Sequence, residues 1–324
     1  MKTTQPEVQA EARIASRIDS RMVHGAPRAD VYDRVTQRIV TALEAGVRPW
    51  SKPWTDTGRK AQIMPLRHNG TPYRGVNVLL LWAQAMECGY TMPVWMTYKQ
   101  AQALGAQVRK GEQGSLVVFA NRMTKRETDE EGTETEKEIA FLKGYTVFNV
   151  EQIDGLPEQY LPPPSAAPAS EIPAFEIIEG AERFFANTGA RVFEGGDRAF
   201  YAPGPDCIRL PLARSFKDAQ SYAATKAHEF IHWTGHQSRL ARGFGARGYG
   251  DDAYATEELV AELGAAFLCA DLGIADEPRE DHVAYLGSWL NALKNDKRLI
   301  FKAAGHAQRA ADYLHGLQPK PQTD

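Results

Sequence analysis

The stretch DAQSYAATKAHEFIHWTG, residues 218–235, carries the clearest signal in this 324-residue sequence. It predicts one helix that contains the motif HExxH, formed by His228, Glu229 and His232. Residues four apart share a helix face, so both imidazoles can reach one metal ion. Two imidazoles and a carboxylate suit Zn²⁺ with one position left open, and Glu229 is placed to accept a proton from water. The alternative is a pair of histidines on an amphipathic helix that binds no metal.

A third ligand is expected from a second helix, predicted at 253–272. The metzincin pattern is excluded, because Ser238 stands where its third histidine would be and all methionines precede residue 124. Glu258 and Glu262 lie one turn apart, which resembles the gluzincin arrangement of a ligand glutamate and a bracing carboxylate. We expect Glu258 as the ligand and Glu262 as the brace of a ligand histidine, with the reverse assignment left open. Zn²⁺ is the expected ion, and Mn²⁺ or Co²⁺ are alternatives.

Peptide hydrolysis at such a site needs further elements. A donor must stabilise the charge that develops on the substrate carbonyl. Tyr249, Tyr254 and His236 are candidates that the sequence does not rank. The strand predicted at 207–212 precedes the HExxH helix, where an edge strand would align a peptide substrate.

Six prolines between Leu156 and Pro173 divide the chain. Proline fixes φ and removes a backbone donor, so residues 157–173 predict an extended linker with few contacts across it. We expect a flexible tail at 1–27, an α+β domain at 28–156 and a mainly helical domain at 174–318. The fold class is therefore α+β.

Local patterns predict the elements of both segments. In the first, Asp30 can cap a helix that ends at Gly46, and further helices are expected at 76–89 and 97–104. Strands are expected at 115–120 and 144–150, joined by a long, solvated acidic connection. In the second, we expect helices at 174–188, 216–235, 253–272 and 280–315, and strands at 190–193, 198–202 and 207–212.

Residues 45–126 combine basic charge with aromatic side chains. They hold 12 basic and three acidic residues, a net charge of +9, although the whole chain has a net charge of −3. Aromatic rings stack on unpaired bases and basic groups neutralise phosphates, so this segment predicts sequence-tolerant binding of single-stranded DNA. The alternative is that the tryptophans are core residues and the charges form a solvated face. The candidate contacts are Trp50, Lys52, Trp54, Arg74, Trp95, Lys99, Arg109 and Lys110.

Several function classes are excluded by the sequence. No Walker A loop, GxGxxG fingerprint or zinc finger is present, so no nucleotide cofactor is implied. Three widely spaced cysteines predict no disulfide framework. No apolar run is long enough to span a membrane, and the N-terminus has no apolar signal region, so we expect a cytoplasmic protein.

A family resemblance rests on stretches that include YRGVNVLLLW (73–82), HEFIHWTGHQSRLAR (228–242) and YATEELVAELGAAFL (254–268). Over residues 28–315 the chain resembles the ArdC-type antirestriction proteins of conjugative plasmids, which are related to the N-terminal part of TraC-type primases. The resemblance implies a single-stranded-DNA-binding domain followed by a zincin-like metallopeptidase domain, and protection of incoming plasmid DNA from host restriction. A host restriction-system protein is a candidate substrate. A DNA-binding shield with a structural or idle metal site is the alternative.

Overall fold

The computed structural model describes residues 30–50, 63–128, 134–161, 174–243, 252–275 and 283–320. The expected tail at 1–27 and most of the linker lie outside these ranges, as do Lys52, Trp54 and Tyr249. The helices are α2 (Val31–Glu44), α3 (Val76–Cys88), α4 (Tyr98–Ala103), α5 (Ala174–Ala186), α6 (Ala219–Thr234), α7 (Asp252–Leu272), α8 (Val283–Asn295) and α9 (Leu299–Gly316). The strands are β1 (Leu66–Arg67), β2 (Val94–Met96), β3 (Gln107–Val108), β4 (Ser115–Thr128), β5 (Glu134–Asn149), β6 (Ile153–Asp154), β7 (Arg191–Glu194), β8 (Phe200–Ala202) and β9 (Cys207–Leu210).

The predicted α+β class is confirmed, and local signals account for the first helices. The Asp30 side chain accepts a hydrogen bond from the Asp33 backbone N–H at 2.8 Å and caps α2. Helix α3 ends at Gly89, whose φ of 72° is the left-handed conformation that glycine adopts without strain. Thr97 caps α4 through a capping box with Gln100.

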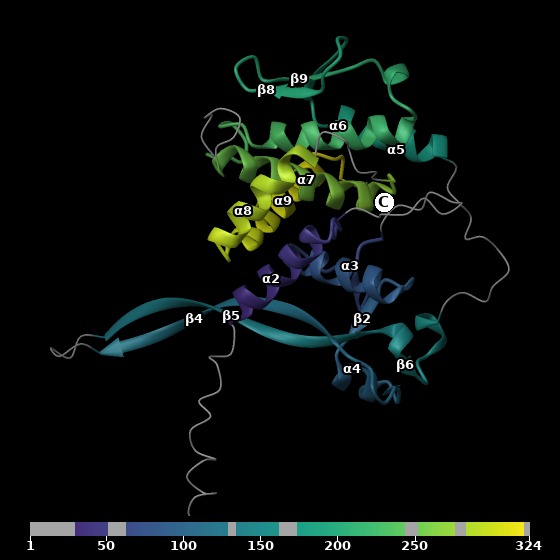
Figure 1. Ribbon diagram of the computed structural model, residues 1–324, viewed down its shortest axis with the longest axis vertical. Coiled ribbons are helices and arrows are strands. Elements are labelled where there is room, and N and C mark those ends of the chain that lie inside the picture. The colour runs from purple at the N-terminus through teal and green to yellow at the C-terminus, as the bar shows by residue number, and fades with distance from the viewer. Residues whose placement is uncertain are drawn as a thin grey trace, which may run out of the picture.

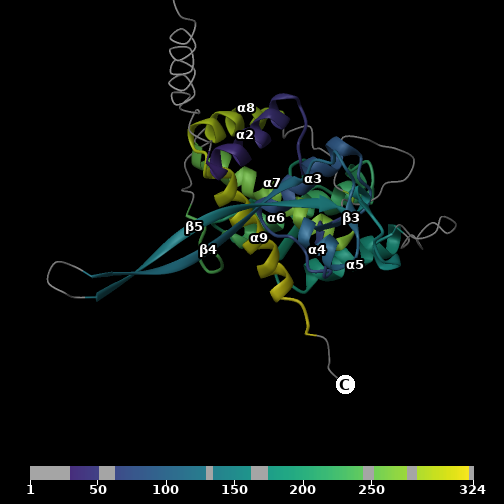
Figure 2. The ribbon, with the colours of Figure 1, turned by 90° about the horizontal axis from the view of Figure 1, so that it is seen from below.

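The sheet of the first segment has the strand order β1-β2-β5-β4. Strands β4 and β5 are much longer than predicted and form an antiparallel ribbon that extends away from the helices (Figures 1 and 2). The expected acidic connection is therefore wrong for the described residues, since Glu134, Glu136 and Glu138 belong to β5. The reason is that ladder hydrogen bonds satisfy the backbone of a two-stranded ribbon even where its faces are solvated.

The second segment has a small sheet in the order β7-β9-β8. Strand β9 pairs in parallel with β7 and antiparallel with β8. The expectation that residues 207–212 form an edge strand for a peptide substrate is wrong, because both edges of β9 are already paired.

The helix expected at 280–315 is two helices, α8 and α9. The Asp296 side chain accepts a hydrogen bond from the Arg298 backbone N–H at 2.8 Å. Such a local Asx turn competes with helical hydrogen bonds, and it separates the two helices here.

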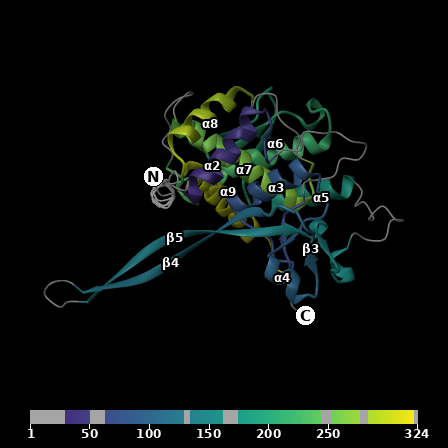
Figure 3. The same cartoon turned by 60° about the horizontal axis from the view of Figure 1, so that its bottom comes forward.

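One hydrophobic core runs through both segments, so the expectation of few contacts across the linker is wrong. Helix α2 packs against α8, and α3 packs against α9 (Figures 1 and 3). The indole of Trp50 meets that of Trp289 edge-to-face, with ring centroids 6.1 Å apart. Trp82 packs against Phe267 at 5.9 Å. The Thr36 hydroxyl donates a hydrogen bond to the Lys297 carbonyl oxygen at 2.7 Å.

Because of this core, we expect the two segments to unfold together. Replacing the buried Trp289 by Ala should destabilise the protein by about 3–5 kcal/mol, the usual cost of truncating a core tryptophan. Hydrogen exchange should then show α2 and α8 losing protection together, with Trp289→Phe as the milder control. Wild-type protection of α2 in Trp289→Ala would mean that the segments fold independently.

Candidate metal centre

Helix α6 carries both histidines of the HExxH motif. It begins where the Asp218 side chain accepts a hydrogen bond from the Ser221 backbone N–H at 2.8 Å, and it runs through small alanines to Gly235. The four-residue spacing places His228 and His232 on one face, as predicted. Their Nε2 atoms face each other at 3.1 Å.

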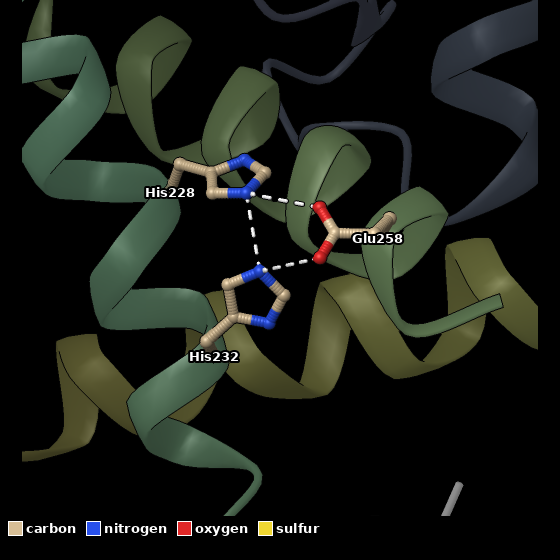
Figure 4. A group of neighbouring side chains, drawn as sticks. All are labelled: His228, His232 and Glu258. Carbon is tan, nitrogen blue, oxygen red and sulfur yellow. Dashed lines mark hydrogen bonds and ion pairs between the residues drawn. The ribbon is translucent and has the colours of Figure 1, made fainter. Parts of the chain in front are cut away.

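Helix α7 crosses α6 and brings Glu258 to the two imidazoles (Figure 4). One carboxylate oxygen of Glu258 lies 3.5 Å from His228 Nε2, and the other lies 3.6 Å from His232 Nε2. One donor atom from each of the three residues lies within 4.8 Å of the other two. Among the described residues, this is the cluster of His, Cys, Asp and Glu side chains that could hold a metal ion.

The spacing of these atoms fits a small divalent cation. Ligands at the usual zinc distances in a tetrahedral site stand about 3.3–3.5 Å from one another. The two imidazole nitrogens are 3.1 Å apart, and each lies 3.5 or 3.6 Å from a different oxygen of the Glu258 carboxylate, so the donors are close enough to converge on one ion. The donor set of two imidazole nitrogens and one carboxylate is also the set expected for a zinc site with an open position.

A second layer of charged side chains stands behind the histidines. Glu257 lies with a carboxylate oxygen 3.2 Å from His232 Nδ1. Glu262, the predicted brace, lies 3.6 Å from His228 Nδ1, which is an ion-pair distance rather than a hydrogen bond. Each histidine therefore has a carboxylate behind it that can orient the ring.

Sequence reasoning missed the roles of Glu257 and Arg242. The buried Arg242 guanidinium donates hydrogen bonds to both Glu257 oxygens, at 2.8 and 3.1 Å, and to the Ile231 carbonyl oxygen at 2.6 Å. It thus holds Glu257 while it closes the C-terminal end of α6. The position of Glu257 directly before Glu258 was a sequence signal for its role near the metal centre. No local pattern marks Arg242.

The carboxylates control the charge of the cluster. Burial alone would lower the pKa of His232, but the carboxylates of Glu257 and Glu258 raise it to about 10. Burial alone would raise the pKa of Glu258, but the two imidazoles hold it well below its usual range. The negative charge of these carboxylates therefore favours a cation at the site. Protons compete with that cation for the imidazole nitrogens.

The remaining predicted residues of this site are placed as follows. Glu229 is buried on α6, next to His228 in the chain. The Tyr254 hydroxyl lies 3.1 Å from that of Tyr285, and burial together with Tyr285 and Glu258 raises the pKa of Tyr254. His236 is half-buried, and its Nδ1 lies 2.8 Å from the Ser238 hydroxyl.

The described members of the predicted DNA-contact set differ in burial and pairing. Trp50 and Trp95 are only 0% and 1% exposed, so the expectation that they stack on bases is wrong: both indoles pack in the core. Arg74 pairs with Asp312, and Arg109 pairs with Glu112 and Asp154. Lys99 and Lys110 are exposed.

Comparisons with known proteins agree with this architecture. A family model of the N-terminal domain of anti-restriction factor ArdC matches residues 29–148, and a model of a zincin-like metallopeptidase matches residues 179–306. Protein y4eC of Sinorhizobium fredii is 43% identical over 297 residues, which are 90% of this chain and 94% of that protein. DNA primase TraC of Escherichia coli is 39% identical over 310 residues, which are 89% of this chain but 27% of the primase.

Solved structures extend the match. The metal-free crystal structure of antirestriction protein ArdC from plasmid R388 is 48% identical, with a TM-score of 0.73, over 89% of this chain and 97% of that one. Its Mn(II)-bound form is 46% identical, with a TM-score of 0.72, over 90% and 100% of the two chains. This chain therefore belongs to the ArdC family of antirestriction proteins and carries a zincin-like metallopeptidase domain.

Proposed function

We propose that this chain protects incoming plasmid DNA from host restriction during conjugation. In this proposal its N-terminal segment, 28–156, binds single-stranded DNA and its C-terminal segment, 174–318, is a zinc-dependent peptidase. A host restriction-system protein is the candidate substrate, and the cytoplasm is the place of action. The observation that carries the proposal is the convergence of His228, His232 and Glu258 beside Glu229 in a member of this family.

Two further findings support parts of this proposal. The Mn(II)-bound structure of the relative and the zincin-like family model support a divalent ion at the centre. The match to the N-terminal ArdC model supports a DNA partner. Within the described residues, no helix has the length and apolar character to cross a membrane.

The side chains of the centre divide the work of peptide hydrolysis. His228, His232 and Glu258 would hold the ion, which lowers the pKa of water and polarises the scissile carbonyl when it is bound. The Glu229 carboxylate accepts a proton from the attacking water and passes it to the leaving amine. Glu257 holds the His232 ring by Nδ1, so that Nε2 stays directed at the centre. Tyr254, beside Glu258, is a candidate donor to the developing oxyanion.

Metal content should separate the ligands from the residues that orient them. Replacing His228, His232 or Glu258 by Ala should remove most of a single divalent ion per chain, because each change deletes a donor atom. Glu262→Ala should keep the ion with about 10–100-fold weaker affinity, because Glu262 approaches His228 from the Nδ1 side. Elemental analysis and chelator competition measure both. Full metal in Glu258→Ala together with metal loss in Glu262→Ala would reverse the two assignments.

The Glu229→Gln variant should distinguish an active peptidase from a shield with an idle metal. The amide cannot accept a proton, so hydrolysis should fall by about 10²–10⁴-fold while the metal content stays unchanged. The assay follows cleavage of restriction-enzyme subunits, with and without single-stranded DNA. Equal cleavage by wild type and Glu229→Gln would refute the role of Glu229 as proton acceptor. A wild-type protein that binds metal and DNA but cleaves nothing would favour the alternative, a DNA-binding shield with an idle metal site.

DNA binding should be independent of Glu229. The full chain should bind single-stranded DNA more tightly than duplex, because stacking uses base faces that a duplex hides. Its affinity should fall with salt, with a slope of about −0.7 per phosphate neutralised. Fluorescence anisotropy of a labelled oligonucleotide at several salt concentrations measures both quantities, and Glu229→Gln should match wild type. Tighter binding of duplex would contradict a single-strand function.

A further inference from the structure

The β4–β5 ribbon has two different faces. In an antiparallel ladder, directly paired residues lie on the same face, and the face alternates along each strand. The register pairs Phe119 with Lys143, and Val117 with Tyr145. We call the side of the ribbon that holds these four residues the Phe119 face. Figure 3 shows the ribbon extending from the body of the molecule.

Near the body, the Phe119 face presents two large aromatic rings to solvent. Phe119 is 47% exposed and Tyr145 is 40% exposed. Their ring centroids lie 6.3 Å apart at an interplanar angle of 81°, and Lys143 Nζ lies 5.1 Å from the Tyr145 centroid. Exposed rings beside a cation supply the two groups that single-stranded nucleic acid binds, a stacking face and a partner for a phosphate.

The same register separates the acidic residues of β5 from this face. Glu134, Glu136 and Glu138 pair with Thr128, Arg126 and Thr124, and all three pairs belong to the opposite face.

Farther along the ribbon the register continues with the pairs Asn121–Phe141, Met123–Ile139 and Lys125–Lys137. Among the described positions of this face, Glu127 near the outer end is the acidic one. The described side chains of this face that can contact a ligand are therefore Phe119, Lys143 and Tyr145.

We propose that the Phe119 face is the surface on which this protein binds single-stranded DNA. The inference rests on the proposed function and gives that binding a location, which the buried Trp50 and Trp95 cannot supply. Unpaired bases stack on Phe119 and Tyr145, and Lys143 neutralises a neighbouring phosphate. Exposed Lys99 lies on α4 and exposed Lys110 lies in the turn after β3, so neither belongs to the ribbon.

The test measures the affinity of the full-length protein for labelled oligothymidine by fluorescence anisotropy. Phe119→Ala and Tyr145→Ala should each weaken binding by about 5- to 150-fold, the range for losing one stacked base. Lys143→Gln should reduce the magnitude of the salt slope by about 0.7, the contribution of one phosphate contact. The melting temperature and metal content of each variant should equal those of wild type, because these side chains are exposed.

A matched control comes from the small sheet. Phe193 on β7 is 48% exposed, with the Arg209 guanidinium 5.5 Å from its ring centroid, but this sheet lies at the far end of the molecule from the ribbon (Figure 1). Phe193→Ala should bind oligothymidine as wild type does. If Phe193→Ala lost as much affinity for oligothymidine as Phe119→Ala, the placement of the DNA-binding surface on the Phe119 face would be overturned.

A second pair of variants separates stacking from general hydrophobic docking. Phe119→Trp should keep wild-type affinity for oligothymidine because it keeps an aromatic ring. Phe119→Leu should bind as weakly as Phe119→Ala because it has no ring to stack. Wild-type binding by Phe119→Leu would overturn a stacking surface and indicate a protein partner. If wild type binds but the ribbon variants bind equally well, this inference fails alone. If wild type does not bind single-stranded DNA, the proposed function fails as well.

Discussion

The close crossing of helices α6 and α7 is the constraint on which the metal centre depends. At the crossing, a side chain on Gly264 would bring a Cβ within 2.9 Å of the Ile231 side chain, so only glycine allows this approach. The crossing brings the carboxylate of Glu258 to the imidazoles of His228 and His232. It also places Glu257 and Glu262 behind the rings. Both helices are anchored in the core that the two segments share, so the N-terminal segment supports the geometry of a site whose described ligand candidates all come from the C-terminal segment.

Charge balance explains why so many ionisable groups can be buried at this crossing. An isolated buried carboxylate or imidazolium is costly, and the cost falls only when each group has a partner. Burial would raise the pKa values of Glu257 and Glu258, but the imidazole of His232 lowers both, together with Arg242 beside Glu257 and His228 beside Glu258. Arg242, which lies just beyond the C-terminal end of α6, adds a positive charge by pairing with Glu257. A divalent cation would offset the remaining carboxylate charge and bind where the imidazoles converge.

The parts that sequence predicts well are those with local causes. The Asp30 cap and the left-handed Gly89 are short-range signals, and the spacing of His228 and His232 places them on one face of any helix. The failures have non-local causes. Trp50 is buried because Trp289, far along the chain, packs against it, and Arg242 acts through a glutamate on another helix. The acidic residues at 134–138 were predicted as part of a connection, but they pair with β4, and such pairing cannot be read from composition.

We expect the two crossing helices α6 and α7 to hold one divalent ion through His228, His232 and Glu258. Anomalous diffraction from crystals of the zinc-loaded protein, recorded on both sides of the zinc absorption edge, locates the ion. One strong anomalous peak per chain should lie within bonding distance of His228 Nε2, His232 Nε2 and a Glu258 carboxylate oxygen. A peak bound by other side chains, or no peak between α6 and α7, would contradict this expectation.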